Sequence, residues 1–206
     1  MLFVIYQIRA RTKPKHMIYA IHLYFLGLSL RNTSKALSCL HIVNRSHTAI
    51  RDWIQKYKPK RLFYKRSNVS EFVIDETQIK VGSEYVWLWV AITPENRRIL
   101  ALDVSKERNM VVAERFIAGL VRAHGKHLVS TDGGTWYPQA CRFLHLKHRI
   151  HSSLEKSLIE RTMQYIKDRT ECFDDYFPCR KGNCRLKHIK RWLELFAFYH
   201  NKKAVR

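Results

Sequence analysis

Two aspartates each follow a short apolar run that is typical of a buried β-strand. Asp75 comes directly after residues 72–74, and Asp132 follows the segment 127–130 by two positions. A carboxylate at the end of an apolar strand must be solvated, hydrogen-bonded or bound to a cation. Carboxylate oxygens are the hard ligands that divalent cations such as Mg²⁺ prefer. The pair therefore indicates a divalent metal site, against the simpler alternative that each aspartate only opens a turn.

A third metal ligand can come from the helix that the spacing predicts over residues 153–170 or from the residue that follows it. Glu155, Glu160 and Glu171 are the candidates. Glu160 lies seven positions before Lys167, which puts an acid and a base on one helix face, two turns apart. A metal ligand and a DNA-contacting base would then be presented together. The alternative is an ordinary solvated helix face, where Glu and Lys often occur at such spacings.

The elements that must position these acids are read from the middle of the chain. Alternating and apolar patterns predict strands over 71–81, 85–93 and 99–104, a helix over 109–123 and a fourth strand over 127–130. This β-β-β-α-β order, followed by helices, predicts an α/β fold with the mixed sheet of an RNase H-like core. The first and fourth strands lie side by side in such a core, so their aspartates converge. Glu76 is expected on the opposite face of its strand from Asp75.

Three short helices are predicted before this core. Apolar residues recur at helical spacing from Met17 to Leu28, Ser29 can cap a second helix, and Ser46 can cap a third. Three helices in about 40 residues, with a tight turn between the first two, fit a helix-turn-helix unit. Any small helical bundle is the alternative. The predicted organisation is a helix-turn-helix domain over 1–57, a basic linker over 58–70 and a catalytic domain over 71–206.

The residues expected to contact DNA lie on the third helix, on the linker and on the later helix. Basic side chains after a groove-reading helix can grip phosphates, and polar side chains on its outer face can reach base edges. The predicted contacts are Arg45, Ser46, His47, Thr48, Arg51, Gln55, Lys56, Lys58, Lys60, Arg61, Arg161 and Lys167.

The distribution of charge supports a polyanionic partner. The chain carries 38 Lys and Arg against 17 Asp and Glu, a formal net charge of +21. Residues 1–71 carry +12, residues 72–140 are neutral, and residues 141–206 carry +9. Counterion release from phosphates favours Lys and Arg, so double-stranded DNA is the expected partner of both basic flanks. The neutral segment holds Asp75 and Asp132.

The location and the cysteines complete the prediction. The apolar runs are too short for a membrane-spanning helix, and residues 1–8 do not read as a signal peptide, so a cytoplasmic, nucleoid-associated protein is expected.

Five scattered cysteines predict reduced thiols. Cys172, Cys179, Cys184 and His188 follow one another as C-x6-C-x4-C-x3-H. That spacing fits no common zinc finger, so free thiols are favoured over a structural Zn²⁺ at Cys179, Cys184 and His188.

Five ordered motifs give the chain a family resemblance. They are Y-F-L-G-L-S-L-R-N with the later T-A-I-R-D-W-I-Q-K-Y, V-I-D-E-T-Q-I-K-V, Y-V-W-L-W-V-A-I, S-T-D-G-G and S-L-I-E-R-T-M-Q-Y-I-K-D-R-T. Together they resemble DDE transposases of the insertion-sequence-six family, including archaeal relatives, whose core is similar to that of retroviral integrases. The resemblance implies a catalytic triad of Asp75, Asp132 and Glu160, with Lys167 as the associated base.

The same resemblance implies the activity and its partners. The triad would hold two Mg²⁺ or Mn²⁺ ions. The protein would bind the terminal inverted repeats of an insertion sequence, and it would cleave and transfer DNA strands as a homodimer or larger assembly. The 27 residues between Asp132 and Glu160 are fewer than is usual for the superfamily. An inactive transposase remnant or a helix-turn-helix regulator is therefore the main alternative. A metal-dependent nuclease of the same fold is the third.

Overall fold

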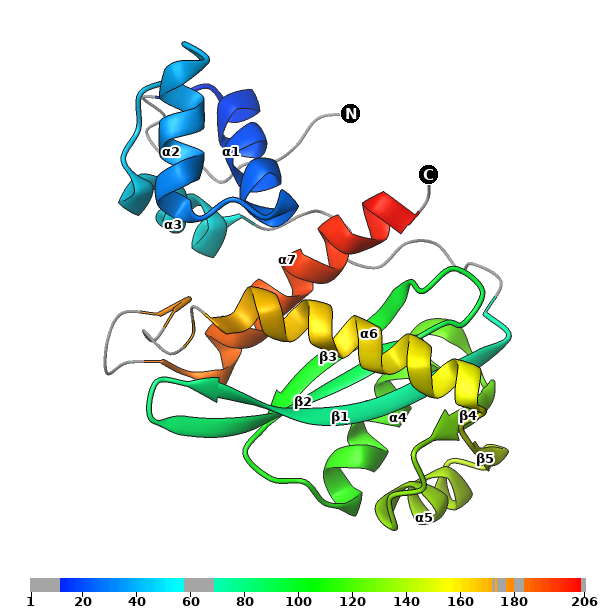
Figure 1. Ribbon diagram of the computed structural model, residues 1–206. Helices are drawn as coiled ribbons and strands as arrows, with labels where there is room; N and C mark the ends of the chain where they lie inside the picture. The colour runs from blue at the N-terminus through cyan, green and yellow to red at the C-terminus, as the bar shows by residue number, and fades with distance from the viewer. Residues whose placement is uncertain (1–11, 58–68, 172, 174–176, 180–183, 205–206) are drawn as a thin grey trace.

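A computed structural model describes residues 12–57, 69–171, 173, 177–179 and 184–204 (Figure 1). The predicted contacts Lys58, Lys60 and Arg61 lie outside the described residues, as does Cys172. No helix in the part of the chain that the structure describes is long and apolar enough to cross a membrane.

A five-stranded mixed sheet forms the centre of the molecule (Figure 1). Its strands are β1 (Glu71–Val81), β2 (Glu84–Ile92), β3 (Ile99–Ser105), β4 (Leu128–Thr131) and β5 (His148–Ile150), in the spatial order β3-β2-β1-β4-β5. The first three strands form an antiparallel meander, whereas β4 pairs in parallel with β1 and β5 in parallel with β4. The predicted mixed sheet and the predicted β1–β4 pairing are confirmed.

Helices cover both faces of the sheet. Helices α4 (Met110–His124) and α5 (Trp136–Phe143) pack on one face, and α6 (Ser153–Thr170) and α7 (Leu186–Ala204) pack on the other. Alternate β1 side chains supply the two cores, because Phe72 faces the α4 side and Val73 faces the α6 side. The C-terminal helix α7 packs into the core with its segment 195–199, which is buried.

Three further helices form an N-terminal helical unit, which we define as residues 12–57. They are α1 (Pro14–Leu26), α2 (Leu30–Cys39) and α3 (His47–Lys56). The predicted caps are present, because Ser29 accepts a hydrogen bond from Asn32 N and Ser46 accepts one from Ala49 N. Helix α1 starts three residues before the predicted Met17, because proline fits the first helical turn without losing a hydrogen bond.

The N-terminal helical unit packs on α7 and on the end of α6 (Figure 1). The Trp192 indole nitrogen donates to the Tyr24 hydroxyl over 3.1 Å. The Arg169 guanidinium donates to the Tyr24 carbonyl over 2.7 Å and lies 5.0 Å from the centre of the Tyr24 ring. The three helices therefore share one hydrophobic core with α6 and α7.

Candidate active site

The candidate site lies where β1 extends beyond β4. The parallel pairing of these strands ends at Val73 and Ser130, while β1 continues to pair with β2 and places Asp75 opposite Val90. Asp75 is thus an interior residue of an eleven-residue strand, and the prediction that it closes a strand is wrong. What ends there is the pairing with β4. This leaves one edge of β1 open beside the loop that follows β4.

Asp132 is held by a tight turn at this open edge. Its Oδ1 accepts a hydrogen bond from the backbone N of Gly134 over 3.0 Å. Gly133 has φ +93°, a conformation that side chains strongly disfavour. A Cβ on Gly134 would come within 2.8 Å of the Trp136 indole, so this position also requires glycine. The T-D-G-G sequence therefore fixes where the Asp132 carboxylate points.

Three carboxylates meet at the open edge. One oxygen each from Asp75, Glu76 and Asp132 lies within 4.8 Å of the other two. The structure thus brings Asp75 and Asp132 together, as the strand order predicted. Leaving Glu76 out of the site was wrong. Its side chain does start on the opposite face, but β1 has no neighbour on this side beyond Val73, and the side chain reaches the other two around the edge.

Glu76 is the most tightly held of the three. It is only 8% exposed, and its Oε2 accepts a hydrogen bond from the Tyr137 hydroxyl of α5. Its Oε1 lies 3.5 Å from the Arg108 guanidinium. Arg108 is in turn stacked between two indoles, 4.3 Å from the Trp87 ring centre and 4.4 Å from that of Trp136. These partners fix the Glu76 carboxylate in one position.

Two carboxylates of the cluster have raised pKa values, although Arg108 lies beside Glu76. The pKa of Asp75 is raised to about 7, mainly by burial, with smaller raising contributions from the charges of Asp132, Glu76 and Glu160 against a lowering hydrogen bond from the Glu76 N–H. Burial also raises the pKa of Glu76, against the lowering effect of the Tyr137 hydrogen bond. A site where three carboxylates converge and burial raises the pKa of two of them fits a divalent cation, because the cation supplies positive charge.

Glu160 and Lys167 lie on the face of the sheet that Asp75 faces. Helix α6 packs on β1, and the Glu160 charge acts on the pKa of Asp75. Glu160 is exposed and does not belong to the group of described side chains whose oxygens lie within 4.8 Å of one another. Lys167 is half-buried two turns further along the helix. Helix α6 thus offers a fourth carboxylate beside the cluster, followed by a cation.

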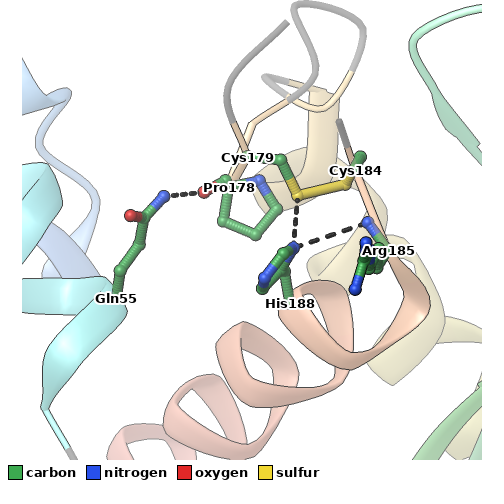
Figure 2. The surroundings of a disulfide bond; sticks show 6 residues. All are labelled: Gln55, Pro178, Cys179, Cys184, Arg185 and His188. Atoms are coloured by element: carbon green, nitrogen blue, oxygen red, sulfur yellow. Dashed lines mark hydrogen bonds between the residues drawn. A yellow bond between two sulfur atoms is a disulfide. The ribbon is translucent and has the colours of Figure 1, made fainter. Parts of the chain in front are cut away.

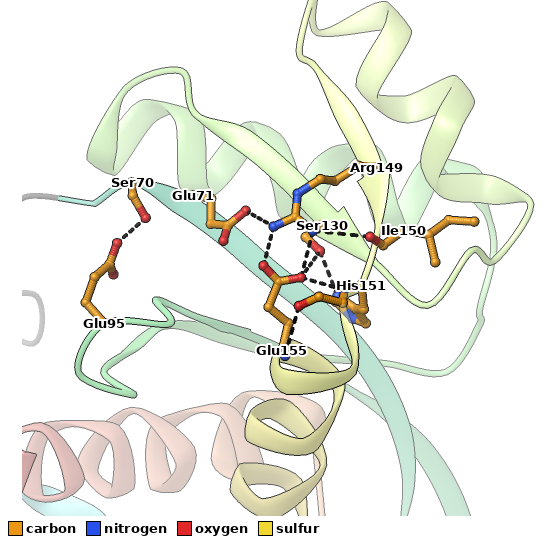
Figure 3. Close-up of polar contacts among 9 residues, drawn as sticks. Ser70, Glu71, Glu95, Ser130, Arg149, Ile150, His151 and Glu155 are labelled. Atoms are coloured by element: carbon orange, nitrogen blue, oxygen red, sulfur yellow. Dashed lines mark hydrogen bonds and ion pairs between the residues drawn. The ribbon is translucent and has the colours of Figure 1, made fainter.

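An ionic network behind the site joins β1, β5 and the start of α6 (Figure 3). Arg149 donates to Glu71 over 2.7 Å and to Glu155 over 2.8 Å. Ser130 donates to Glu155 over 3.1 Å and shares a hydrogen bond of 2.9 Å with His151. Burial raises the pKa of Glu155, but its hydrogen bonds with Arg149, Glu71 and Ser152 together outweigh burial and lower that pKa to about 2. The network fixes the register of the elements that carry Asp75, Asp132 and Glu160.

The predicted DNA contacts of the N-terminal helical unit divide into two groups. Ser46, His47, Thr48 and Lys56 are exposed, as is Arg161 on α6. The others are partly buried and contact other groups of the protein. Arg45 donates to Thr12 over 2.6 Å, Arg51 lies 3.6 Å from Asp52, and Gln55 donates to the Pro178 carbonyl. The exposed group is therefore the part of the predicted DNA surface that is open to a ligand.

Comparison with known proteins supplies the family. A model described as a DDE domain, of the IS240 type of transposase, matches residues 69–204. An uncharacterized protein of Methanocaldococcus jannaschii is 31% identical over 194 residues, which cover 94% of this chain and 88% of that protein. The matched residues include the whole sheet and helices α4 to α7.

Solved structures match the fold. One chain of the simian T-cell lymphotropic virus intasome, solved with the PP2A regulatory subunit B56 gamma, gives a TM-score of 0.50 at 17% identity, covering 86% of this chain and 67% of that chain. The catalytic core domain of BIV integrase gives a TM-score of 0.46 at 16% identity, covering 62% of this chain and 82% of that chain. The mixed sheet with helices on both faces is the RNase H-like fold of integrase catalytic cores.

Proposed function

Because this chain belongs to the DDE transposase family, we propose that it cleaves and transfers DNA strands with divalent metal ions held by its acidic cluster. The observation that carries the proposal is the convergence of Asp75, Glu76 and Asp132 at the open edge of β1. Glu160 approaches from α6 as the third member of the triad that the family resemblance implies. The carboxylates act as ligands, and none needs to accept a proton from the substrate.

The residues of the site have separate tasks in this mechanism. Divalent ions bound there would activate a water or a DNA 3′-hydroxyl for in-line attack and stabilise the leaving oxygen. Asp75 from β1 and Asp132 from the turn after β4 would hold the ions, and the turn at Gly133 keeps Asp132 in place. Glu76 adds a buried carboxylate whose position Tyr137 and Arg108 fix. Which of Mg²⁺ and Mn²⁺ is used follows from availability, because both prefer oxygen ligands.

DNA would be held by basic side chains of α6 and by exposed side chains of the N-terminal helical unit. Arg161 and Lys167 follow Glu160 on α6, where they can contact the backbone of the cleaved end. The N-terminal helical unit would contact a second stretch of duplex, as a helix-turn-helix does, through Ser46, His47, Thr48 and Lys56. We propose that these surfaces bind the terminal inverted repeats in at least a dimer, since two DNA ends must be joined, and that the protein works at the nucleoid.

One experiment separates this proposal from its alternatives. The full chain is incubated with Mg²⁺ or Mn²⁺ and labelled duplexes that carry terminal inverted repeats, and the products are resolved on a denaturing gel. Joined strands are the expected result. Cutting without joining would favour a nuclease of the same fold, and binding without either reaction would favour an inactive remnant or a regulator.

A further inference from the structure

A group of sulfur and nitrogen atoms lies at the start of α7 (Figure 2). The sulfurs of Cys179 and Cys184 are joined as a disulfide, and the Nδ1 of His188 lies 3.4 Å from the Cys179 sulfur. Reduced thiols were predicted here, and for this pair the prediction is wrong. The described cysteines Cys39 and Cys141 are free thiols.

We propose that in its reduced form this cluster is a zinc site, with the thiolates of Cys179 and Cys184 and the Nδ1 of His188 as ligands. With zinc bonds of about 2.3 Å to sulfur and about 2.0 Å to nitrogen, two ligands of a tetrahedral ion stand about 3.5 Å apart. The 3.4 Å between the His188 nitrogen and the Cys179 sulfur matches this separation. Zinc binding releases the thiol protons and changes no oxidation state.

The local chain presents these donors together. Cys184 lies two residues before α7 begins at Leu186, and His188 lies in the first turn of that helix. The His188 Nδ1 lies 3.4 Å from the Arg185 N–H, which donates toward it, so this nitrogen is the unprotonated one of the ring. An unprotonated ring nitrogen is the form of histidine that binds a metal.

A disulfide alone accounts less well for the cluster. The two cysteines are five positions apart, and closing so short a loop removes little entropy from the unfolded chain. A disulfide also does not account for the His188 Nδ1 beside the Cys179 sulfur. Sulfur and nitrogen donors select zinc over Mg²⁺, so the site would not compete with the all-oxygen cluster at Asp75.

The position of the cluster indicates what zinc would stabilise. Pro178, next to Cys179, accepts the Gln55 hydrogen bond from α3 (Figure 2). A cavity between α3 and α7 is lined by both partners of this bond together with Cys179 and His188. A zinc ion would therefore hold the Pro178 segment against the N-terminal helical unit and brace the junction between that unit and the core.

The test is the metal content of the full chain purified under reducing conditions without added zinc. We expect about one zinc per chain by elemental mass spectrometry. Cys184→Ser and His188→Ala should each weaken binding at least tenfold. Cys39→Ser, which removes an exposed free thiol, should keep the full content. Zinc-free wild-type protein, or equal zinc in all variants, would overturn the proposal.

A spectroscopic measurement keeps the proposal testable if these variants fail to fold. Co²⁺ is added to metal-stripped, reduced wild-type protein. Two thiolates and an imidazole should give the strong visible bands of tetrahedral cobalt and a sulfur-to-cobalt charge-transfer band. Only the weak bands of octahedral cobalt, or an intact mass that retains the disulfide after reduction, would contradict the zinc site.

Discussion

Replacing Asp132 by Asn is expected to abolish strand cleavage and joining, with a loss of at least about a thousandfold. The amide keeps the shape of the side chain, and its oxygen can still accept the hydrogen bond from Gly134, so the turn should survive. What is lost is the negative charge that pairs with the metal. Binding to inverted-repeat DNA should change little, because the phosphate contacts come from other surfaces.

The assay is the gel-based strand-transfer reaction, run beside a binding measurement on the same protein. Glu84→Gln is the matched control, because it also removes one carboxylate, from the exposed start of β2, where Glu84 faces Lys106 over 3.5 Å. It should retain wild-type activity. Full activity of Asp132→Asn, or an equal loss in the control, would refute the assignment of Asp132 as a metal ligand.

Replacing Asp75 by Asn should stabilise the metal-free protein, raising its free energy of unfolding at neutral pH. Asp75 is half-buried among like charges, and its pKa in the folded chain is about 7, against an ordinary value of 3.8. The folded state therefore binds a proton that the unfolded state has released. Asp75 therefore does not lower the free energy of unfolding below about pH 4, and it lowers this free energy increasingly between about pH 4 and 7.

The expected gain from Asp75→Asn is about 2 kcal/mol at pH 8, after allowance for solvent screening, and close to zero at pH 4. The asparagine oxygen can still accept the Glu76 N–H hydrogen bond of 2.8 Å. Urea unfolding with a chelator at both pH values measures the difference, and excess Mn²⁺ should cancel or reverse it, since only the wild type binds the ion well. A destabilised variant at pH 8 without metal would show that Asp75 is structural.

Local patterns predicted most of the elements. Ser29 and Ser46 cap helices as expected, and the apolar runs predicted β1 to β3 because strands buried on both faces are largely apolar. Helix α5 and strand β5 were missed. Strand β5 has only three residues, too few for a periodic signal, and its place is fixed by pairing with β4.

Only part of the site could be predicted from the sequence, because its third carboxylate depends on long-range strand pairing. The strand order was sufficient to bring Asp75 and Asp132 together. Glu76 was missed because alternation assigns it to the other face, and only the end of the β1–β4 pairing, which depends on long-range contacts, lets it reach the cluster. Two histidines add side-chain bonds at this end of the sheet, because His148 bonds Thr131 and His151 bonds Ser130.

The most direct test of the acidic metal site is a calorimetric titration of metal-free protein with Mn²⁺ at pH 8. Wild-type protein and the Glu84→Gln control should bind Mn²⁺ with the same affinity, and Asp132→Asn should bind at least about tenfold more weakly because one charged ligand is gone. Equal affinity in all three proteins would contradict the account, because the carboxylates at the open edge of β1 would then not hold the metal.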